Sequence, residues 1–424
     1  MKHANQDGPT LAWLRRHRAD LRRFAAASAA PGGGFGWLDD AGDRREDRDV
    51  ELWITCRMTH VFALGVLEGD SGCAPLLDHG VQALRGRLHD DVHGGWYSAV
   101  GTHGPTATAK EGYGHAFVLL AASSALTAGH PDARSLLDDA LSVHDERFWR
   151  TADDLVVDVW NRDWSALENY RGINANMHTV EALLAVGDVT TDAIWLQRAH
   201  RILTRVVEEF AAPHGYRMPE HFAADWTARL DYNRGDPAHP FRPFGVTIGH
   251  LLEWARLAVH VQTAVGSDAS PRLLDHARSM FDVAVCDGWG VDGTAGFVYT
   301  TDFDGRAVVR DRLHWVVTEA IATAWSLHEA TGDQQYLDWY GQWWDYACEY
   351  LLDGTGSWRH ELDPENRPAA TVWQGKPDVY HAYQASLLPE LNRPISFAGG
   401  AYDLAQRRRA TASSSPATSP MGEG

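Results

Sequence analysis

Two kinds of helical segment alternate along the chain. Segments of the first kind are amphipathic: apolar residues recur at i, i+3, i+4 and i+7, with Arg, Asp and Glu between them. Segments of the second kind are apolar or small on most sides, which is typical of a buried helix. The amphipathic segments cover residues 11–29, 75–89, 133–148, 193–210, 271–285 and 335–352, and the apolar ones begin at Glu51, Glu111, Asn174, Val246, Leu313 and Val379.

Loops of similar composition join each amphipathic segment to the apolar one that follows it. Most of them place Gly beside an aromatic residue, as in GGGFGWLDD from Gly32, HGGWYSAV from His93 and GSWRHELDP from Gly356. Glycine at turn positions between short apolar stretches indicates β-hairpins. The same unit of amphipathic helix, hairpin and apolar helix is therefore predicted six times.

Six helix pairs predict an all-α fold, an (α/α)6 barrel with six inner and six outer helices and short hairpin loops at one end. The alternative is an open solenoid, which needs polar capping at both terminal repeats. The last apolar segment is as apolar as the middle ones, which favours closure. We expect one barrel domain over residues 1–406. Residues 407–424 are rich in Ser, Ala, Thr and Pro, so a disordered C-terminal tail is predicted there.

Charge and composition narrow the classes of partner. With 38 Lys and Arg against 57 Asp and Glu, the net charge of -19 argues against nucleic acid. The N-terminal sequence has no signal-peptide pattern, and no run approaches the ~18 apolar residues of a membrane span. None of the four cysteines forms a CxxC pair. We expect a cytoplasmic protein that binds no membrane; the sequence leaves its oligomeric state open.

Histidine marks the start of the apolar segments. The chain contains 22 His and 18 Trp, and a His lies near the start of all six apolar segments. Chain direction places these starts at one end of a barrel, so polar residues in the first turns should converge on one pocket. They are Arg57, His60, Tyr113, His115, Asn174, His178, His250, Glu253, His314, Trp315, Glu319, Tyr380 and His381.

Some of these residues allow two interpretations. Arg57 lies on an apolar helix and needs either a structural carboxylate or a polar substrate, because a lone buried charge is costly. His60 and His115 suit a hydrogen-bonded core as well as a pocket. The H-x-x-E spacing of His178–Glu181 and His250–Glu253 places each pair on one helix face. We interpret each Glu as orienting its His, the alternative being a metal site.

The mixture of side chains favours proton transfer over other chemistry. Glycoside hydrolysis needs paired carboxylates, for which Glu253, Glu319 and Asp378 are candidates. Imidazoles outnumber acids at the predicted pocket, which suits proton transfer next to a carbonyl better than acetal cleavage. A non-catalytic, sugar-binding toroid is a further alternative, but it requires no titratable groups at every inner helix.

Several long segments carry a family resemblance. ELWITCRMTHVFALG, NANMH, GHLLEWARL, HWVVTEAIATAW and WQGKPDVYHAYQASLLP resemble the N-acylglucosamine 2-epimerase superfamily, and within it the bacterial D-mannose isomerases, which group with the sulfoquinovose isomerases. The resemblance extends from about Leu11 to Pro389. It implies an (α/α)6 barrel that converts a monosaccharide without metal or cofactor. The reaction implied is aldose–ketose isomerisation of D-mannose and D-fructose, or of D-lyxose and D-xylulose, with 2-epimerisation as the alternative.

The resemblance also implies roles for individual residues. His250 and His381 would perform the acid–base steps. Because Arg57 is permanently cationic, we expect it to stabilise the enediolate oxygen. We expect Glu253 to hold the tautomer of His250. Arg242, ahead of the fourth apolar helix, is the candidate cation for a sulfonate substrate. The implied substrate-binding residues are Tyr113, Asn174, His178, Glu253, Trp315 and Glu319.

Overall fold

The computed structural model describes residues 8–414, and its helices form two concentric rings. The inner ring consists of α2 (Leu52–Leu67), α4 (Gly112–Thr127), α6 (Ile173–Thr190), α8 (Ile248–Val265), α10 (His314–Thr331) and α12 (Tyr380–Leu387). The outer ring consists of α1 (Leu11–Ala26), α3 (Ala74–Arg85), α5 (Ala133–Val143), α7 (Ala193–Arg205), α9 (Leu273–Gly288) and α11 (Gln334–Tyr346). Short 3-10 turns lie at Ser71–Cys73, Ala212–His214, Gly266–Asp268 and Leu388–Glu390.

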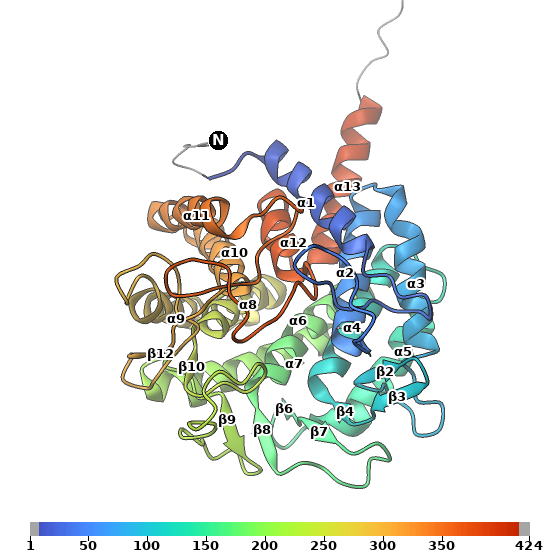
Figure 1. Ribbon diagram of the computed structural model, residues 1–424, viewed down its shortest axis with the longest axis horizontal. Coiled ribbons are helices and arrows are strands. Elements are labelled where there is room, and N and C mark those ends of the chain that lie inside the picture. Colours follow the sequence, from blue (N-terminus) through green and yellow to red (C-terminus); the bar gives the residue numbers. More distant parts are fainter. Residues whose placement is uncertain (1–7, 415–424) are drawn as a thin grey trace, which may run out of the picture.

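The inner ring is closed. Each inner helix packs against the next one, and α12 returns to contact α2. In Figure 1 the colours run around the ring from α1 to α11, and α12 lies between α10 and α2. This arrangement confirms the predicted (α/α)6 barrel and excludes an open solenoid.

Sequence pattern explains which helices are inside. The segment GYGHAFVLLAASSALT of α4 has no charged residue, and most of its residues are buried. Helix α7 instead buries the stripe of Ala199, Ile202 and Leu203 and exposes its other faces. Three outer helices continue into a π-helical turn, at His144–Phe148, Val206–Ala211 and Ala347–Leu351. The amphipathic segments predicted from the sequence are longer than helices α5, α7 and α11, and these π-helical turns make up the difference.

Short strands fix where the inner helices begin. The strands β1 (Val50–Glu51), β4 (Lys110–Glu111), β8 (Tyr170–Gly172), β10 (Val246–Thr247) and β13 (Arg312–Leu313) lead directly into α2, α4, α6, α8 and α10. Each pairs antiparallel with a strand of the next connection, respectively β2 (Ala99–Gly101), β7 (Val159–Trp160), β9 (His221–Ala223), β11 (Thr300–Thr301) and β14 (Glu361–Leu362). The remaining strands are β3 (Gly104–Ala107), β5 (Trp149–Arg150), β6 (Leu155–Val156) and β12 (Ala307–Val309). The helix starts are thus held together at one end.

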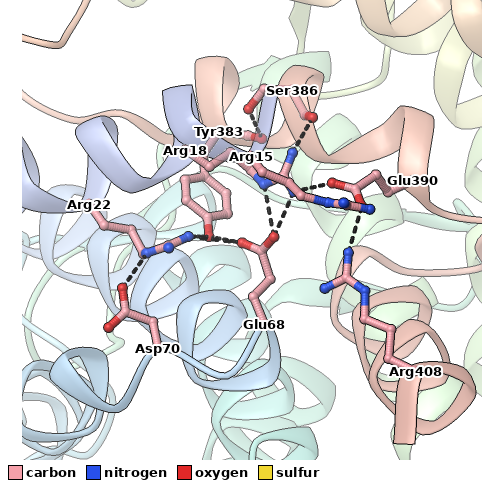
Figure 2. Close-up of polar contacts among 9 residues, drawn as sticks. All are labelled: Arg15, Arg18, Arg22, Glu68, Asp70, Tyr383, Ser386, Glu390 and Arg408. Atoms are coloured by element: carbon pink, nitrogen blue, oxygen red, sulfur yellow. Dashed lines mark hydrogen bonds and ion pairs between the residues drawn. The ribbon is translucent and has the colours of Figure 1, made fainter. Parts of the chain in front are cut away.

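A buried ionic cluster joins the first and last parts of the ring (Figure 2). Arg18 of α1 is fully buried and donates from Nε and Nη2 to Oε1 of Glu68, at 2.9 and 2.7 Å. It also donates to Glu390 and to the carbonyl of Ser386, both beyond the start of α12. Arg22 donates to the second oxygen of Glu68 at 2.9 Å. Because Glu68 ends α2, the cluster ties α1, α2 and α12 together.

Helix α13 (Phe397–Ser414) differs from the sequence prediction. We predicted disorder from Arg407, but the helix continues to Ser414; residues 415–424 lie outside the described part. The start of α13 is anchored because Phe397 and Ala401 are buried, and the helix packs against α2, α4 and α6. Further along, Arg408 forms an ion pair with Glu390 at 2.6 Å. The boundary at Arg407 is therefore not where helical structure ends.

Two further sequence expectations concern hydropathy and cysteines. Across residues 8–414, each helix is too short or too polar to cross a membrane. Cys56 and Cys73 are buried thiols, and Cys286 and Cys348 are exposed thiols.

Candidate active site

A cavity opens at the end of the barrel where the inner helices begin. Its volume is about 700 Å³ including the opening to solvent, within the usual range for a small-molecule site. All of the predicted site residues except Glu319 line it: Arg57, Tyr113, Asn174, His178, His250, Glu253, Trp315 and His381. Most of the inner-helix residues that were expected to converge therefore line one cavity, whereas His60, His115, Glu319 and Tyr380 do not.

His381, in the first turn of α12, is held by the carboxylate of Glu319, which does not line the cavity. Its Nδ1 lies 2.9 Å from Oε1 of Glu319, whose other oxygen accepts from Nε of Arg256 at 2.8 Å. Burial alone would raise the pKa of Glu319, but the charge of Arg256 and the hydrogen bond with His381 lower it to about 2. Nδ1 of His381 therefore carries the hydrogen, which leaves Nε2 of the neutral ring as the unprotonated nitrogen. Burial lowers the pKa of His381, so its ring is neutral near pH 7.

His250, in the first turn of α8, is held in the same way by a different residue from the one predicted. Its Nδ1 lies 3.0 Å from both oxygens of Glu220, a buried residue just before β9. We expected Glu253 to hold this ring. Glu253 instead lies one turn deeper, 3.7 Å from Nδ1 of His178 and 3.4 Å from Nη2 of Arg256. The expected pairing of His250 with Glu253 is wrong.

Glu253 is a buried acid beside other acids. Burial raises its pKa well above the usual range, and the negative charge of Glu319 raises it further. The positive charge of Arg256 lowers the pKa, but by less than burial and Glu319 raise it. The protonated form of Glu253 is therefore more favoured than that of an ordinary carboxyl, and in that form it can donate a hydrogen bond. Glycoside hydrolysis through Glu253 and Glu319 is not favoured, because Glu319 lies behind His381 and is engaged by Arg256.

Arg57 pairs with a carboxylate and also lines the cavity, so both interpretations of its place on an apolar helix hold. Its Nη1 donates to Oδ2 of Asp378 at 3.1 Å, and its Nη2 donates to the Tyr113 hydroxyl at 3.0 Å. The guanidinium also lies 4.6 Å from the centre of the Phe117 ring. Its Nε is buried and has no partner among the described residues. Arg57 thus has a structural carboxylate and still faces the cavity.

Asn174 and His178 bring further polar atoms to the cavity. Oδ1 of Asn174 and Nδ1 of His178 are buried, and neither has a hydrogen-bond partner within residues 8–414. His178 lies 3.7 Å from Glu181, which is close but too long for a hydrogen bond. Burial lowers the pKa of His178 to about 3, so the ring is neutral. Both residues are therefore available to a polar ligand.

Trp315 lies between the two carboxylate-held histidines. Its ring centre is 5.3 Å from that of His250 and 5.7 Å from that of His381. A Cβ at Gly249 would lie 2.2 Å from this ring, so the indole position requires glycine there. An aromatic face of this kind suits the C–H face of a sugar.

His60 and His115 belong to the core. His60 bonds through Nδ1 to the Ser124 hydroxyl at 2.7 Å. His115 bonds through Nδ1 to the Glu111 carbonyl at 2.7 Å and accepts from the backbone N–H of Trp96. The structural interpretation of these two histidines is the right one. The cavity is also lined by His314 and Asp378, which the sequence analysis singled out, and by residues that it did not: Trp53, Pro240, Phe241, Pro243, Tyr299, His360, Trp373 and Pro377.

Arg242 lies outside this cavity. Its two terminal nitrogens each donate to an oxygen of Glu168 at 3.0 Å, and its guanidinium lies 3.9 Å from the centre of the Tyr170 ring. Among the described residues that line the cavity, Arg57 is the one Lys or Arg. Arg242 instead lines an adjoining hollow that shares Trp53, Tyr113, Asn174 and Phe241 with the cavity, and there it is paired with Glu168.

Between residues 8 and 414, two groups of side chains are close enough to hold a metal ion. His178, Glu181 and Glu253 form one group, and Glu253, Glu319 and His381 form the other, with ligand atoms within 4.8 Å of one another. Arg256 already places its guanidinium on Glu253 and Glu319. Glu181 accepts from Tyr380 and Gln384. Because protein donors engage these carboxylates, we retain the prediction of metal-free chemistry.

Comparison with known proteins agrees with this arrangement. The sequence model described as N-acylglucosamine 2-epimerase (GlcNAc 2-epimerase) matches residues 33–385. The D-mannose isomerase of Thermobifida fusca is 52% identical over 391 residues, 92% of this chain and 96% of the relative. The D-mannose isomerase of Pseudomonas cannabina pv. alisalensis is 48% identical over 384 residues, 89% of this chain and 92% of the relative.

Solved structures show the same fold. A crystal structure of D-mannose isomerase aligns with a TM-score of 0.84 at 27% identity, covering 96% of this chain and all (100%) of that one. The cellobiose 2-epimerase of Spirochaeta thermophila aligns with a TM-score of 0.76 at 19% identity, covering 94% of this chain and 98% of that one. With its sequence match, closed helical barrel and histidine-lined cavity, the chain belongs to the N-acylglucosamine 2-epimerase family.

Proposed function

We propose that this protein is an aldose–ketose isomerase that interconverts D-mannose and D-fructose, and D-lyxose and D-xylulose, through an enediol. The observation that carries the proposal is the pair of His250 and His381, which lie on either side of Trp315 and are each held at Nδ1 by a carboxylate. The D-mannose isomerases that are similar over nearly the whole chain support the same substrate.

The reaction needs a base for the proton on C2 of the ring-opened sugar. A neutral imidazole held at Nδ1 presents Nε2 as that base. One of His250 and His381 takes the C2 proton and returns it to C1. The other assists ring opening and moves protons between the two sugar oxygens.

The enediolate also needs stabilisation, because a proton beside an aldehyde is only weakly acidic. Donors fixed in place before the reaction stabilise developing oxygen charge by several kcal/mol. Arg57 is permanently cationic, and its geometry is fixed by Asp378 and Tyr113. Glu253 also lines the cavity, and its raised pKa favours the protonated form, which donates to a sugar hydroxyl.

The charge in the cavity supports a neutral aldose. The negative charge of Asp378 balances the positive charge of Arg57. Arg242 does not line the cavity and forms an ion pair with Glu168. A sulfonate or phosphate would be buried without its own cation, which costs several kcal/mol. The hydroxyls of a neutral sugar match Tyr113, Asn174 and His178.

A proton NMR time course in deuterated water tests the proposal. D-mannose, D-lyxose, D-glucose and sulfoquinovose are each incubated with the enzyme, with and without a chelator. We expect ketose from mannose and lyxose, deuterium incorporation at the exchanging carbon, and no effect of the chelator. Glucose as the main product from mannose would indicate 2-epimerisation instead. Loss of activity with chelator, or a ~100-fold preference for sulfoquinovose, would overturn the metal-free or neutral-substrate assignment.

A further inference from the structure

Several cavity atoms are buried without a hydrogen-bond partner. Within the described part of the chain they are Nε of Arg57, Oδ1 of Asn174, Nδ1 of His178, and both ring nitrogens of His314. A buried polar atom without a partner is costly and rare in native proteins, so each one calls for an explanation. His314 is distinctive because neither of its ring nitrogens has hydrogen-bond geometry with a described residue, although a contact with the His360 backbone partly offsets the lowering of its pKa by burial.

His314 is rigidly placed. It is the first residue of α10, and its backbone N–H donates to the His360 carbonyl at 3.0 Å. The residue before it, Leu313, pairs with Glu361 in the β13–β14 ladder. The His314 ring stacks on the His360 ring with centres 3.8 Å apart and planes 23° apart. The side chain therefore cannot turn to solvent without breaking the stack, and it is only 5% exposed.

The ring is neutral and bifunctional. Burial lowers the pKa of His314 to about 3 and holds that of His360 well below the usual value. A neutral imidazole has one donor and one acceptor nitrogen. A sugar hydroxyl both donates and accepts, so either tautomer of His314 matches it.

His314 differs from the two predicted acid–base histidines in one respect. His250 and His381 each have a carboxylate on Nδ1, which fixes the tautomer. Neither nitrogen of His314 has such a partner among residues 8–414. A base needs a fixed tautomer, whereas a residue that binds hydroxyls does not.

We propose that His314, supported by its stack on His360, binds hydroxyl groups of the sugar away from the reacting carbons and selects for their presence. This inference rests on the proposed function. The substrate supplies the partners that the ring nitrogens lack in the free protein. A site built to bond a hydroxyl discriminates strongly against an analogue that lacks it, because its polar groups are then left unpaired.

The test compares His314→Phe and His314→Asn with the unchanged protein on D-mannose and on its 3-deoxy, 4-deoxy and 6-deoxy analogues. Phenylalanine keeps the ring and the stack but removes both nitrogens, and asparagine keeps one donor and one acceptor. His328→Phe is the matched control, because His328 lies near the other end of α10 and does not line the cavity. Thermal unfolding of each variant reports its stability.

We expect His314→Phe to unfold at the same or a higher temperature than the unchanged protein, since it buries no unpaired nitrogen. Its kcat/KM for mannose should fall by about 10- to 100-fold, the range for a lost substrate hydrogen bond. His314→Asn should retain more activity than His314→Phe. For at least one deoxy analogue, His314→Phe should cause little further loss, because that analogue already lacks the bonded hydroxyl.

Two results would overturn the inference. One is His314→Phe with kcat/KM within about threefold of the unchanged protein. The other is an equal loss in both variants on all four sugars together with a lowered unfolding temperature, which indicates packing alone. Failure of the proposed function is distinct, because the unchanged protein would then form no ketose from mannose.

Discussion

Both carboxylate oxygens of Glu220 lie 3.0 Å from Nδ1 of His250. The second histidine has an equivalent contact, since Oε1 of Glu319 lies 2.9 Å from Nδ1 of His381. Each of the two histidines is thus held at Nδ1 by a carboxylate, and the two carboxylates come from separate parts of the chain. Because Glu220 and Glu319 belong to different elements, the effect of each carboxylate can be tested separately.

Glu220→Gln should lower kcat by about tenfold or more with a smaller effect on KM. Glutamine can turn its NH2 toward Nδ1, which favours the wrong tautomer of His250, and it removes the charge that stabilises the protonated ring. Steady-state kinetics and the pH profile of kcat measure the effect. A kcat within about threefold of normal, with an unchanged pH profile, would remove Glu220 from this positioning role.

His250→Ala and His381→Ala should each reduce kcat by at least ~10²-fold, the usual scale for a general acid or base. Circular dichroism checks that each variant is folded. Deuterium exchange at C2 then separates the roles, because the variant without the C2 base should lose exchange. Near-normal turnover in either variant would exclude that histidine from the mechanism.

Arg57→Lys should restore little of the activity lost in Arg57→Ala. Separate nitrogens of the guanidinium bind Asp378 and Tyr113, at 3.1 and 3.0 Å, while Nε remains available. A lysine ammonium has one nitrogen and cannot reproduce this geometry. We expect both variants to lose at least ~10²-fold in kcat/KM. Lysine activity within a few-fold of normal would show that charge alone suffices.

The free energy of unfolding should fall as the pH falls below about 6.5. Burial lowers the pKa of His60 to about 4, and those of His115, His178 and His260 to about 3. Between these pKa values and about 6.5, the unfolded chain binds more protons than the folded protein does. Each of these histidines therefore lowers the free energy of unfolding by up to about 1.4 kcal/mol for every pH unit of acidification. Burial raises the pKa of Asp158 to about 7. Acidification below pH 7 therefore increases the contribution of Asp158 to the free energy of unfolding, opposite to the effect of the histidines. Urea unfolding at pH 7, 6 and 5 measures the sum, and equal values would contradict the prediction.

Arg18→Ala should destabilise the fold by about 3–5 kcal/mol, because it leaves the buried carboxylates of Glu68 and Glu390 without their shared partner. Arg23→Ala is the control on the same helix: Arg23 is exposed and pairs with Asp20. It should change stability by less than about 1 kcal/mol. Equal effects of the two substitutions would mean that the cluster in Figure 2 does not hold the ring together.

The fold was predictable because its signals are local. Apolar periodicity separates inner from outer helices, and glycine beside aromatic residues marks the hairpins. The end of α13 was not predictable, because its helical state involves docking of Phe397 and an ion pair from Arg408 to Glu390. Composition alone does not contain these long-range contacts.

The site was predictable where a residue type conflicts with its surroundings. Arg57 is a charge on an apolar helix, and His250 and His381 are polar residues at apolar helix starts. Glu220 carried no such signal, since it lies in a loop 30 positions before the histidine that it holds. The spacing of Glu253 from His250 suggested the wrong partner because one helix turn points the carboxylate deeper into the barrel.

Closure of the ring has a consequence for synthesis on the ribosome. Arg57 and Asp378, which bind each other at the cavity, are 321 positions apart. At about 5–20 residues per second, roughly 15–60 seconds separate their translation. During that interval the nascent chain carries α2 without α12, the neighbour that completes the ring. The ring therefore closes only when almost all of the described chain has emerged, and until then the inner helices lack the neighbour that completes their burial.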